Sequence, residues 1–231
     1  LKQTFAGKFI VFDGPDGSGK GTQIRMLAER LRAAGLEVVF AKDPGGTVIG
    51  DRIRSVLLDH DLTDMDVRCE TFLFMASRAQ LVGEVIDPAL AAGKVVLCDR
   101  FISSTLAYQG ALGYDQKKII ELGRVAVGNT WPQVTIILDV PPDEGFRRTG
   151  RKPSQVGRNR KRDSGQGLLL ADAQVDAMEA RPIEFHRKVH KLFLSLPPEY
   201  PSHVVVIDGS GTAEEVHARV MSALESSLAA G

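Results

Sequence analysis

The sequence predicts an α/β protein whose five-stranded parallel sheet is flanked by helices on both faces. Five short runs rich in Val, Ile, Leu and Phe alternate with longer segments in which apolar residues recur at helical spacing. Each short run is nearly continuously apolar, which is typical of parallel strands that are covered on both faces. At 231 residues the chain is long enough to bury the core of one such domain, so we expect residues 1–231 to form a single domain.

The expected strands are clusters of β-branched and apolar residues. In chain order they are KFIVF (8–12), EVVFA (37–41), KVVLC (94–98), VTIILDV (134–140) and HVVVID (203–208). The first expected helix lies between the first two strands and places on one face Ile24, Leu27, Ala28 and Leu31. Gly35 follows it and is a typical residue at a helix end. Further helical patterns cover about 66–92, 116–127, 171–194 and 213–228. Helices between successive strands favour parallel connections.

The stretch RRTGRKPSQVGRNRKRDSGQG, residues 147–167, does not fit this alternation. It is rich in Gly, Ser and Arg and has no apolar periodicity. Because it is too short to form a second folded unit, we expect a mobile excursion from the domain, a lid over the sheet edge.

Composition limits the classes of partner. Lys plus Arg equals Asp plus Glu at 29 each, so overall charge indicates neither a nucleic acid nor a membrane partner. No apolar run approaches the roughly 20 residues that a membrane span needs, and the first residues lack the apolar core of a signal peptide. We expect a cytoplasmic protein in which Cys69 and Cys98 are reduced, buried thiols.

The stretch GPDGSGKGTQ, residues 14–23, predicts a phosphate-binding loop. It directly follows the first strand and opens the first helix, which is the context that such a loop requires. Its glycines let backbone N–H groups converge on phosphate oxygens, and the helix N-terminus adds partial positive charge. Lys20 supplies a full charge at the β and γ phosphates of a nucleotide. The residues expected to bind ATP here are Gly14, Pro15, Asp16, Gly17, Ser18, Gly19, Lys20, Gly21 and Thr22.

Gly21 departs from the usual pattern of this loop. Most such loops carry Ser or Thr at this position as a direct magnesium ligand, whereas Thr22 comes one position later here. We therefore expect Mg²⁺ to be held more through water, with Thr22 and a carboxylate from elsewhere. Asp99, at the carboxyl end of the third strand, is the candidate, because ligands of such sheets gather beyond the carboxyl ends of the strands.

Three further stretches belong with the loop: KDPGGT (42–47), FLFMASRAQ (72–80) and DRFISSTLAYQG (99–110). Together with the loop and EFHRKV (184–189), they give nearly the whole chain a strong resemblance to the thymidylate kinases. This resemblance implies a three-layer P-loop kinase fold and transfer of the γ-phosphoryl of ATP to dTMP. The combination of DPGGT with DRFxxSTxAYQG is much more specific than the phosphate loop alone.

The resemblance implies roles for residues near the acceptor's phosphate and sugar. Asp16 resembles the acid that reaches the sugar 3′-hydroxyl. Arg100 resembles the arginine that holds the acceptor phosphate, assisted by Arg54. Tyr108 resembles the ring packed under the deoxyribose, where a ribose 2′-hydroxyl would not fit.

The base is implied to meet another group of side chains. Phe74 resembles the ring that stacks on thymine, and Arg78 the donor to a base carbonyl. These two residues are four positions apart, so they project from one helix face. Thr105 and Gln109 resemble further base contacts. The expected dTMP-binding set is completed by Pro44 and Ser104.

The lid is expected to add positive charge. Thymidylate kinases without an arginine in the phosphate loop carry compensating arginines on the lid, and the loop position is Gly17 here. The lid candidates are Arg151, Arg158, Arg160 and Arg162, and one or two of the last three are expected to close over the transferring phosphoryl. Arg148 is expected against adenine. The Asp-Arg pair frequent after the lid is replaced by Asp176-Ala177, which leaves open which arginine acts.

Phosphoryl transfer between two anions needs positioned positive charge more than it needs a nucleophile. The residues expected to take part are Lys20, Asp99, Arg100, Arg158, Arg160 and Arg162. An adenylate-kinase-like enzyme is one alternative, because GSGKGTQ also resembles that family's loop. A non-catalytic P-loop protein that binds nucleic acid through 158–162 is another. The sequence leaves open whether the acceptor is dTMP or dUMP. The resemblance also implies a homodimer formed through the long helices, including 72–86.

Overall fold

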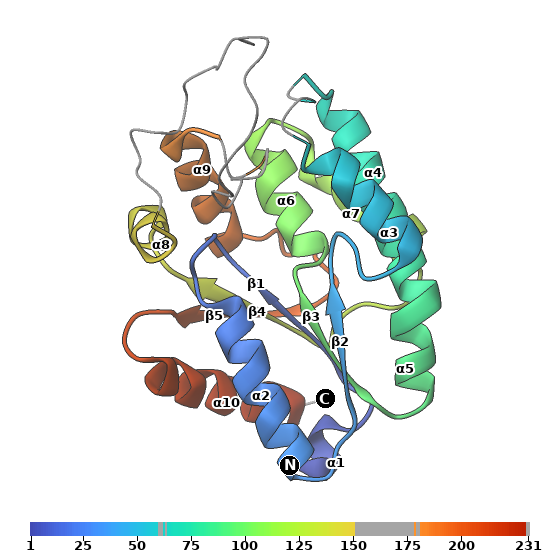
Figure 1. Cartoon of the computed structure of the whole chain (residues 1–231), viewed down its shortest axis with the longest axis vertical. Coiled ribbons are helices and arrows are strands. Elements are labelled where there is room, and N and C mark those ends of the chain that lie inside the picture. The colour runs from blue at the N-terminus through green and yellow to red at the C-terminus, as the bar shows by residue number, and fades with distance from the viewer. Residues whose placement is uncertain (60–61, 63, 151–177, 179–180, 230–231) are drawn as a thin grey trace, which may run out of the picture.

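The computed structural model describes residues 1–59, 62, 64–150, 178 and 181–229. Within them, five strands form one sheet in the order β2-β3-β1-β4-β5, and all neighbouring strands are parallel (Figure 1). Their bounds are β1 Phe9–Asp13, β2 Val38–Lys42, β3 Val95–Asp99, β4 Val134–Asp139 and β5 His203–Asp208. Each expected strand is present within one residue at either end, and the predicted parallel sheet is confirmed.

Helices cover both faces of this sheet. One face packs against α1 (Lys2–Phe5), α2 (Lys20–Ala33) and α10 (Ala213–Ala229). The other face packs against α4 (Val67–Leu81), a π-helical segment (Val82–Ile86), α5 (Asp87–Ala91), α6 (Ile102–Ala111) and α7 (Gln116–Val127). Successive side chains of β1 point to opposite faces of the sheet, so Phe12 packs in the core under α2 and α10 and Val11 in the core under α4 and α6. The remaining helices are α3 (Val48–Leu57), α8 (Pro142–Arg148) and α9 (Ile183–Leu194).

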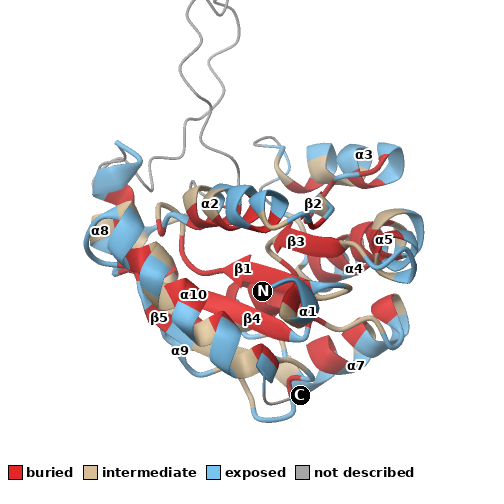
Figure 2. Ribbon diagram, turned by 90° about the horizontal axis from the view of Figure 1, so that it is seen from below, coloured by how far each residue is buried: buried red, intermediate tan, exposed pale blue. Residues whose placement is uncertain are grey.

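The strands are not all buried to the same degree. β1, β3 and β4 are buried along nearly their whole length, as the red ribbon in Figure 2 shows. β2 and β5 are the edge strands and leave several residues exposed or half-buried. The predicted cover on both faces is only partial at β2 and β5. In β2, for example, Val38 packs against the core on one face and Val39 against the core on the other, and both are half-buried.

The expected helices agree with the structure except at two points. The pattern at 66–92 is a continuous helical stretch that changes to π-helical winding at Val82. Arg181 and Pro182 are not helical, so the described helix expected from residue 171 begins only at Ile183. Cys98 is buried as predicted, but Cys69 is exposed on α4, so that prediction is wrong. None of the helices in the described ranges is long and apolar enough to cross a membrane.

The predicted excursion lies mostly outside the described residues. Arg147 and Arg148 are the last residues of α8, so the chain does not leave the domain as early as residue 147. Residues 151–177 are not described, and the expected lid arginines Arg151, Arg158, Arg160 and Arg162 fall among them, as does the pair 176–177.

The loop between β1 and α2 packs tightly against α8 (Figure 1). Gly17 has a φ of +73°, and a Cβ built on it would collide with the backbone of Gly145 in α8. A Cβ on Gly145 would collide in turn with the carbonyl oxygen of Asp16. Both positions therefore require glycine, and the contact fixes the height of the loop above the sheet.

Candidate functional site

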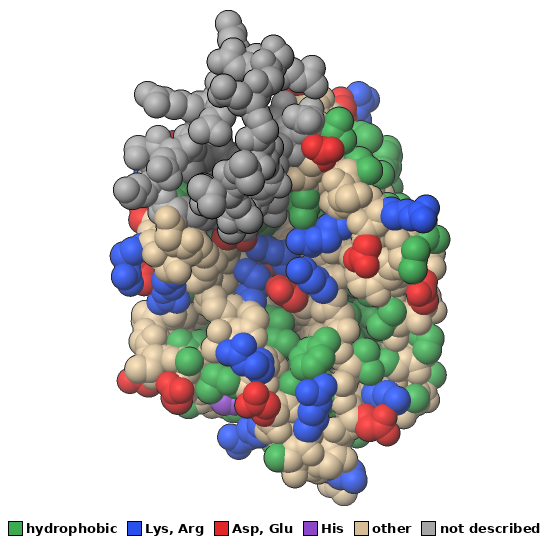
Figure 3. Space-filling model, viewed as in Figure 1, with side chains coloured by type: hydrophobic (Ala, Val, Ile, Leu, Met, Phe, Trp, Pro, Cys, Tyr) green, Lys and Arg blue, Asp and Glu red, His purple; other side chains and the backbone are tan. Residues whose placement is uncertain are grey.

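The carboxyl ends of β1, β2 and β3 bring the predicted segments together. The loop at 14–19 follows β1, the segment 43–47 follows β2, and 100–101 lead from β3 into α6. Lys and Arg side chains gather at the centre of this face of the molecule (Figure 3). Among the described residues this edge holds two cavities, which share part of their lining.

The phosphate loop has the conformation that its glycines predict. Gly14 and Gly19 have φ values of 129° and 94°, in the region that only glycine adopts readily. α2 begins at Lys20, directly after the loop, so its N-terminal N–H groups face the same space. The loop thus combines a glycine-rich backbone with a helix N-terminus, which is an anion-binding arrangement.

Lys20 is buried at the base of this loop. Its Nζ donates to the carbonyl oxygens of Gly14 (3.1 Å) and Pro15 (3.0 Å) and, more weakly, to Ser18 Oγ (3.5 Å). Burial and the nearby Arg100 lower the pKa of Lys20 to about 8. Its ammonium is therefore held by the loop itself and lines the second cavity.

Arg100 occupies the centre of the site. Its Nη2 pairs with Asp16 Oδ1 at 2.5 Å, and its Nη1 lies 3.4 Å from Asp13 Oδ1. The guanidinium also stacks over the Tyr108 ring, 5.4 Å from its centroid. Its backbone φ of 68° is in the left-handed region, which is uncommon for a residue with a side chain and marks functional sites. The guanidinium lines both cavities.

Asp13 is a residue of the site that sequence reasoning missed. It is fully buried at the end of β1 and accepts from Gly14 N (2.9 Å), Ser103 Oγ (2.6 Å) and Ser104 Oγ (2.8 Å). It thereby ties the phosphate loop to the first turn of α6, with Arg100 between them. Its position as the last strand residue before the loop is the signal that could have identified it.

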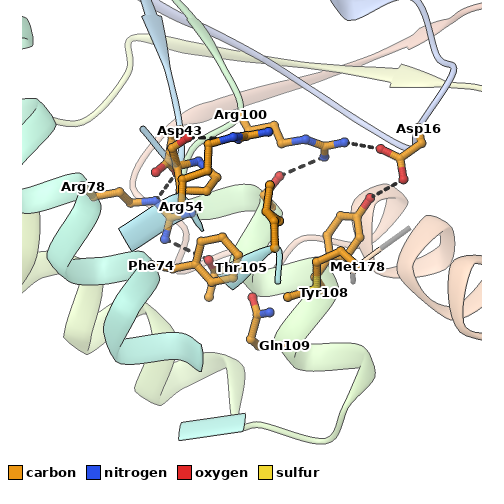
Figure 4. A pocket seen from close by; sticks show the side chains of 13 residues that line it. Asp16, Asp43, Arg54, Phe74, Arg78, Arg100, Thr105, Tyr108, Gln109 and Met178 are labelled. Atoms are coloured by element: carbon orange, nitrogen blue, oxygen red, sulfur yellow. Dashed lines mark hydrogen bonds and ion pairs between the residues drawn. The ribbon is translucent and has the colours of Figure 1, made fainter. Parts of the chain in front are cut away.

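The first cavity is lined by side chains of α3, α4 and α6 together with residues of the loops that follow β1, β2 and β3. Figure 4 shows the side chains that line it. It contains every residue expected to bind dTMP: Asp16, Pro44, Arg54, Phe74, Arg78, Arg100, Ser104, Thr105, Tyr108 and Gln109. Sequence reasoning missed three further lining residues: Asp43, Leu58 and Met178.

Arg78 is fully buried and forms a network inside the protein. Its Nε pairs with Asp43 Oδ2 (2.6 Å), Nη1 donates to Thr105 Oγ1 (2.8 Å), and Nη2 donates to the Phe101 carbonyl (2.8 Å). Burial raises the pKa of Asp43 to about 6, although Arg78 opposes this change. Arg78 thus joins α4 to the segments after β2 and β3, in addition to lining the pocket.

Two aromatic rings form walls of the pocket. Phe74 on α4 is nearly buried, with the Arg78 guanidinium 5.7 Å from its centroid. Tyr108 on α6 packs edge-on against Phe193 of α9, and its hydroxyl lies 3.4 Å from Asp16 Oδ2. Burial raises the pKa of Tyr108 well above its ordinary value, so the hydroxyl keeps its proton. A flat ring can enter between apolar surfaces here.

Gln109 closes the far end of the pocket. Its Nε2 donates to Glu70 Oε2 at 2.9 Å, and the other oxygen of Glu70 accepts from Arg181 Nη2 at 2.8 Å. Glu70 is buried on α4, and Arg181 precedes α9. Neither residue was predicted, because their 111-residue separation leaves no local pattern.

Two further predicted arginines differ in their position relative to the cavities. Arg54 on α3 donates to the Pro44 carbonyl (3.0 Å) and lines both cavities. Arg148 is held away from them, because its Nε pairs with Glu144 (2.8 Å) and its Nη groups donate to the Gly209 carbonyl (3.2 Å). Gly209 follows β5, so Arg148 lies beyond the end of an edge strand.

The second cavity contains residues that suit a phosphate-bound magnesium ion. Asp99 and Lys20 both line it. Asp99 Oδ1 is buried and has no hydrogen-bond partner in the described part of the chain. One free carboxylate oxygen beside phosphates is the donor set that Mg²⁺ accepts, since it keeps several waters. Thr22 is not in the lining, and the described residues hold no cluster of three or more metal-ligating side chains.

Comparison with known proteins identifies the family. The model of the thymidylate kinase family matches residues 12–220. The thymidylate kinase of Desulfosudis oleivorans is 41% identical over 94% of this chain and 96% of its own length. That of Syntrophotalea carbinolica is 40% identical over 92% of both chains. The crystal structure of thymidylate kinase from Ehrlichia chaffeensis superposes with a TM-score of 0.66 at 28% identity, over 95% of this chain and 99% of that one. The chain belongs to the thymidylate kinase family.

Proposed function

We propose that this enzyme transfers the γ-phosphoryl of ATP to dTMP, yielding dTDP and ADP for dTTP synthesis. The observation that carries the proposal is the pair of cavities at the sheet edge, which meet at Arg100 and Asp16. One cavity has aromatic walls and suits a nucleoside monophosphate. The other adjoins the phosphate loop and Lys20 and suits the phosphates of ATP. Membership of the thymidylate kinase family supports this assignment over an adenylate-kinase-like enzyme or a nucleic-acid-binding protein.

The proposed mechanism relies on placed charge. Two unit charges about 4 Å apart repel each other by roughly 4 kcal/mol at an effective dielectric near 20. Arg100 holds the dTMP phosphate between the cavities, and Lys20 neutralises the β and γ phosphates of ATP. The loop amides and the N-terminus of α2 add donors that are oriented before the substrates arrive. An acceptor phosphate is already an anion, so no general base is required.

Substrate binding displaces contacts that exist in the free protein. Lys20 donates to its own loop, and Arg100 pairs with Asp16. When phosphates arrive, Lys20 exchanges loop carbonyls for phosphate oxygens. Arg100 exchanges its pairing with Asp16 for the phosphate of dTMP, and Asp16 is then free to accept a hydrogen bond from the sugar 3′-hydroxyl. These exchanges are the binding steps that we assign to the two side chains.

Asp99 is the proposed protein ligand of Mg²⁺, which when bound with ATP supplies charge neutralisation between the phosphates. Its free oxygen and its place in the second cavity support this role. Thr22 does not line the second cavity, so any contact of its hydroxyl with Mg²⁺ would run through water. The roles of Arg148, Arg158, Arg160 and Arg162 toward ATP remain predictions from the resemblance.

We further propose that the enzyme is a homodimer. Val48 and Ile49 on α3 and Phe72 on α4 are 71%, 51% and 54% exposed, and α3 packs against α4. A second copy of the chain packed against these residues would explain why such large apolar side chains are exposed.

Because ATP and nucleoside monophosphates are cytoplasmic metabolites, we place the activity in the cytoplasm.

An ATP-coupled assay across dTMP, dUMP, AMP and CMP tests the proposed reaction. We expect dTMP to be the best acceptor. dUMP should be weaker by about 5- to 200-fold, because one methyl group in an apolar pocket is worth only about 1–3 kcal/mol. Phosphorylation of AMP without phosphorylation of dTMP would overturn the proposal.

ATP affinity is expected to fall as the pH rises above about 8. The pKa of Lys20 in the free protein is lowered to about 8 by burial and by Arg100, so Lys20 is charged below this pH and increasingly neutral above it. ATP phosphates favour the charged form, so binding above pH 8 takes up a proton. The dissociation constant should then rise by up to about tenfold per pH unit.

Calorimetric titration with ATP in two buffers of different ionisation enthalpy measures this proton uptake. A Lys20→Arg variant is the control, because its guanidinium stays charged throughout this range. It should bind ATP without proton uptake, whatever its affinity. Absence of proton uptake by the unchanged protein near pH 8.5, roughly half a unit above the pKa of Lys20, would contradict the prediction.

A further inference from the structure

We infer that Glu70 selects the hydrogen-bonding edge of the base that the first cavity accepts, because it fixes the amide orientation of Gln109. The inference rests on the proposed function to the extent that this cavity holds a nucleotide base. Glu70 itself does not line the cavity. It is therefore a positioning residue that acts through Gln109, and its effect should appear in specificity more than in turnover.

Glu70 is held in place from two sides. Its side chain is buried on α4, one turn before Phe74, so both residues face the interior beside the pocket. Oε1 accepts from Arg181 Nη2 at 2.8 Å, and Oε2 accepts from Gln109 Nε2 at 2.9 Å. Arg181 is itself packed over the Phe185 ring, 4.8 Å from its centroid. The carboxylate thus has one donor on each oxygen and little freedom to turn.

This arrangement decides which end of the Gln109 amide faces the cavity. A carboxylate paired with arginine accepts hydrogen bonds and cannot donate them. Gln109 must therefore turn its NH₂ group toward Glu70, which leaves Oε1 on the other side. Figure 4 shows the Gln109 amide directed toward the space beside Phe74 and Thr105. The reversed amide would set two acceptors against each other and cost a buried hydrogen bond.

Gln109 Oε1 is left as an acceptor for a ligand. The Gln109 side chain is fully buried and lines the first cavity. Oε1 has no hydrogen-bond partner among the residues that the structure describes. Buried polar atoms are almost always paired, so a buried acceptor that lines a cavity points to a donor on the bound molecule.

A base that fits must present an N–H group at this edge. Thymine and uracil carry a hydrogen on ring nitrogen N3, which can donate to Gln109 Oε1. Cytosine carries a lone pair on N3, so it would place one acceptor against another. Glu70 thereby makes the cavity selective for pyrimidines with an imide N–H, and the 5-methyl group plays no part in this choice.

The test is a Glu70→Gln variant, measured by the dissociation constants of dTMP, dUMP and dCMP in calorimetric titrations. A glutamine at position 70 can donate as well as accept, so the Gln109 amide can turn over. The ratio of the dCMP constant to the dTMP constant should fall about tenfold or more, the scale set by one unsatisfied buried polar group. The ratio of dUMP to dTMP should stay unchanged, because both bases carry the same N–H.

Glu84→Gln is the matched control. Glu84 also accepts from a glutamine amide, that of Gln80 at 2.7 Å, on the same helical stretch, but this pair is exposed and far along the helix from the pocket. In Glu84→Gln, the dCMP-to-dTMP ratio and the dUMP-to-dTMP ratio of dissociation constants should both stay unchanged. An unchanged dCMP ratio in Glu70→Gln would overturn the inference, as would equal changes in both ratios, which indicate a generally loosened pocket.

A second variant keeps the inference testable if Glu70→Gln does not fold. Gln109→Leu removes the amide and leaves the Glu70–Arg181 pair in place, and it should lose the same discrimination against dCMP. Retained discrimination would overturn the inference. Because these are binding measurements, they are separate from the kinase assay. A chain that binds dTMP selectively without phosphorylating it would refute the proposed function and leave the role of Glu70 standing.

Discussion

Replacing Arg100 with alanine is expected to lower kcat/KM for dTMP by about 30-fold to several thousandfold. Removing one partner from a desolvated charge pair costs about 2–5 kcal/mol. Here the loss acts twice, because Arg100 binds the incoming phosphate and also offsets the charges of Asp13 and Asp16. Without the guanidinium, the charges of the two carboxylates are no longer offset, and they repel the phosphate.

Steady-state kinetics with each substrate varied separately measure this effect. KM for ATP should change much less than KM for dTMP, because Lys20 and the loop amides hold the ATP phosphates. Arg68→Ala is the control: Arg68 lies on α4 and pairs with Asp66, but its side chain is 70% exposed and away from the cavities. Thermal unfolding of both variants checks that the fold survives. A loss of kcat/KM for dTMP below tenfold would refute the role of Arg100.

Replacing Lys20 with methionine should lower kcat by about 10²- to 10³-fold, the range for losing one donor that stabilises transition-state charge. Methionine keeps the length and apolar character of the side chain, so the space at the base of the loop remains filled. The carbonyls of Gly14 and Pro15 lose a donor, which adds a small effect on the loop itself. The charge lost at the phosphates is the larger effect.

Single-turnover measurements with saturating ATP separate the chemical step from ATP binding. dTMP affinity should stay within a few-fold of that of the unchanged enzyme, since Arg100 and the first cavity are intact. Lys42→Met provides a comparison, because Lys42 lines the second cavity as Lys20 does, but its side chain is exposed. Equal losses in the two variants would show that general positive charge, and not the position of Lys20, is what matters.

The strands, α2 and the phosphate loop could be predicted because each depends on a local pattern. Continuous apolar runs identified β1, β3 and β4, and strand–glycine–helix order identified the loop. α6 was not predicted as a helix for a physical reason: residues 102–109 are all buried, so the segment lacks the polar face that makes helical spacing visible. α3 and α8 are short, with 10 and 7 residues, and they were missed as well.

The site was predictable only where a motif carries it. The resemblance to thymidylate kinases supplied all ten side chains of the first cavity that we expected. Asp13, Asp43, Glu70 and Arg181 act by pairing with residues 35 to 111 positions away, as the contacts of Arg78 with Asp43 and of Glu70 with Arg181 illustrate. The fold brings these distant residues together, and no local spacing in the sequence predicts the pairs.

The contact between Gly17 and Gly145 restricts how this enzyme can change over time. A side chain at either position would push the phosphate loop away from α8, so an arginine at position 17 does not fit this packing. The positive charge that some family members place at this loop position has to originate from another part of this chain. Each glycine faces the backbone of the other segment, so no substitution at one position can make room for a side chain at the other.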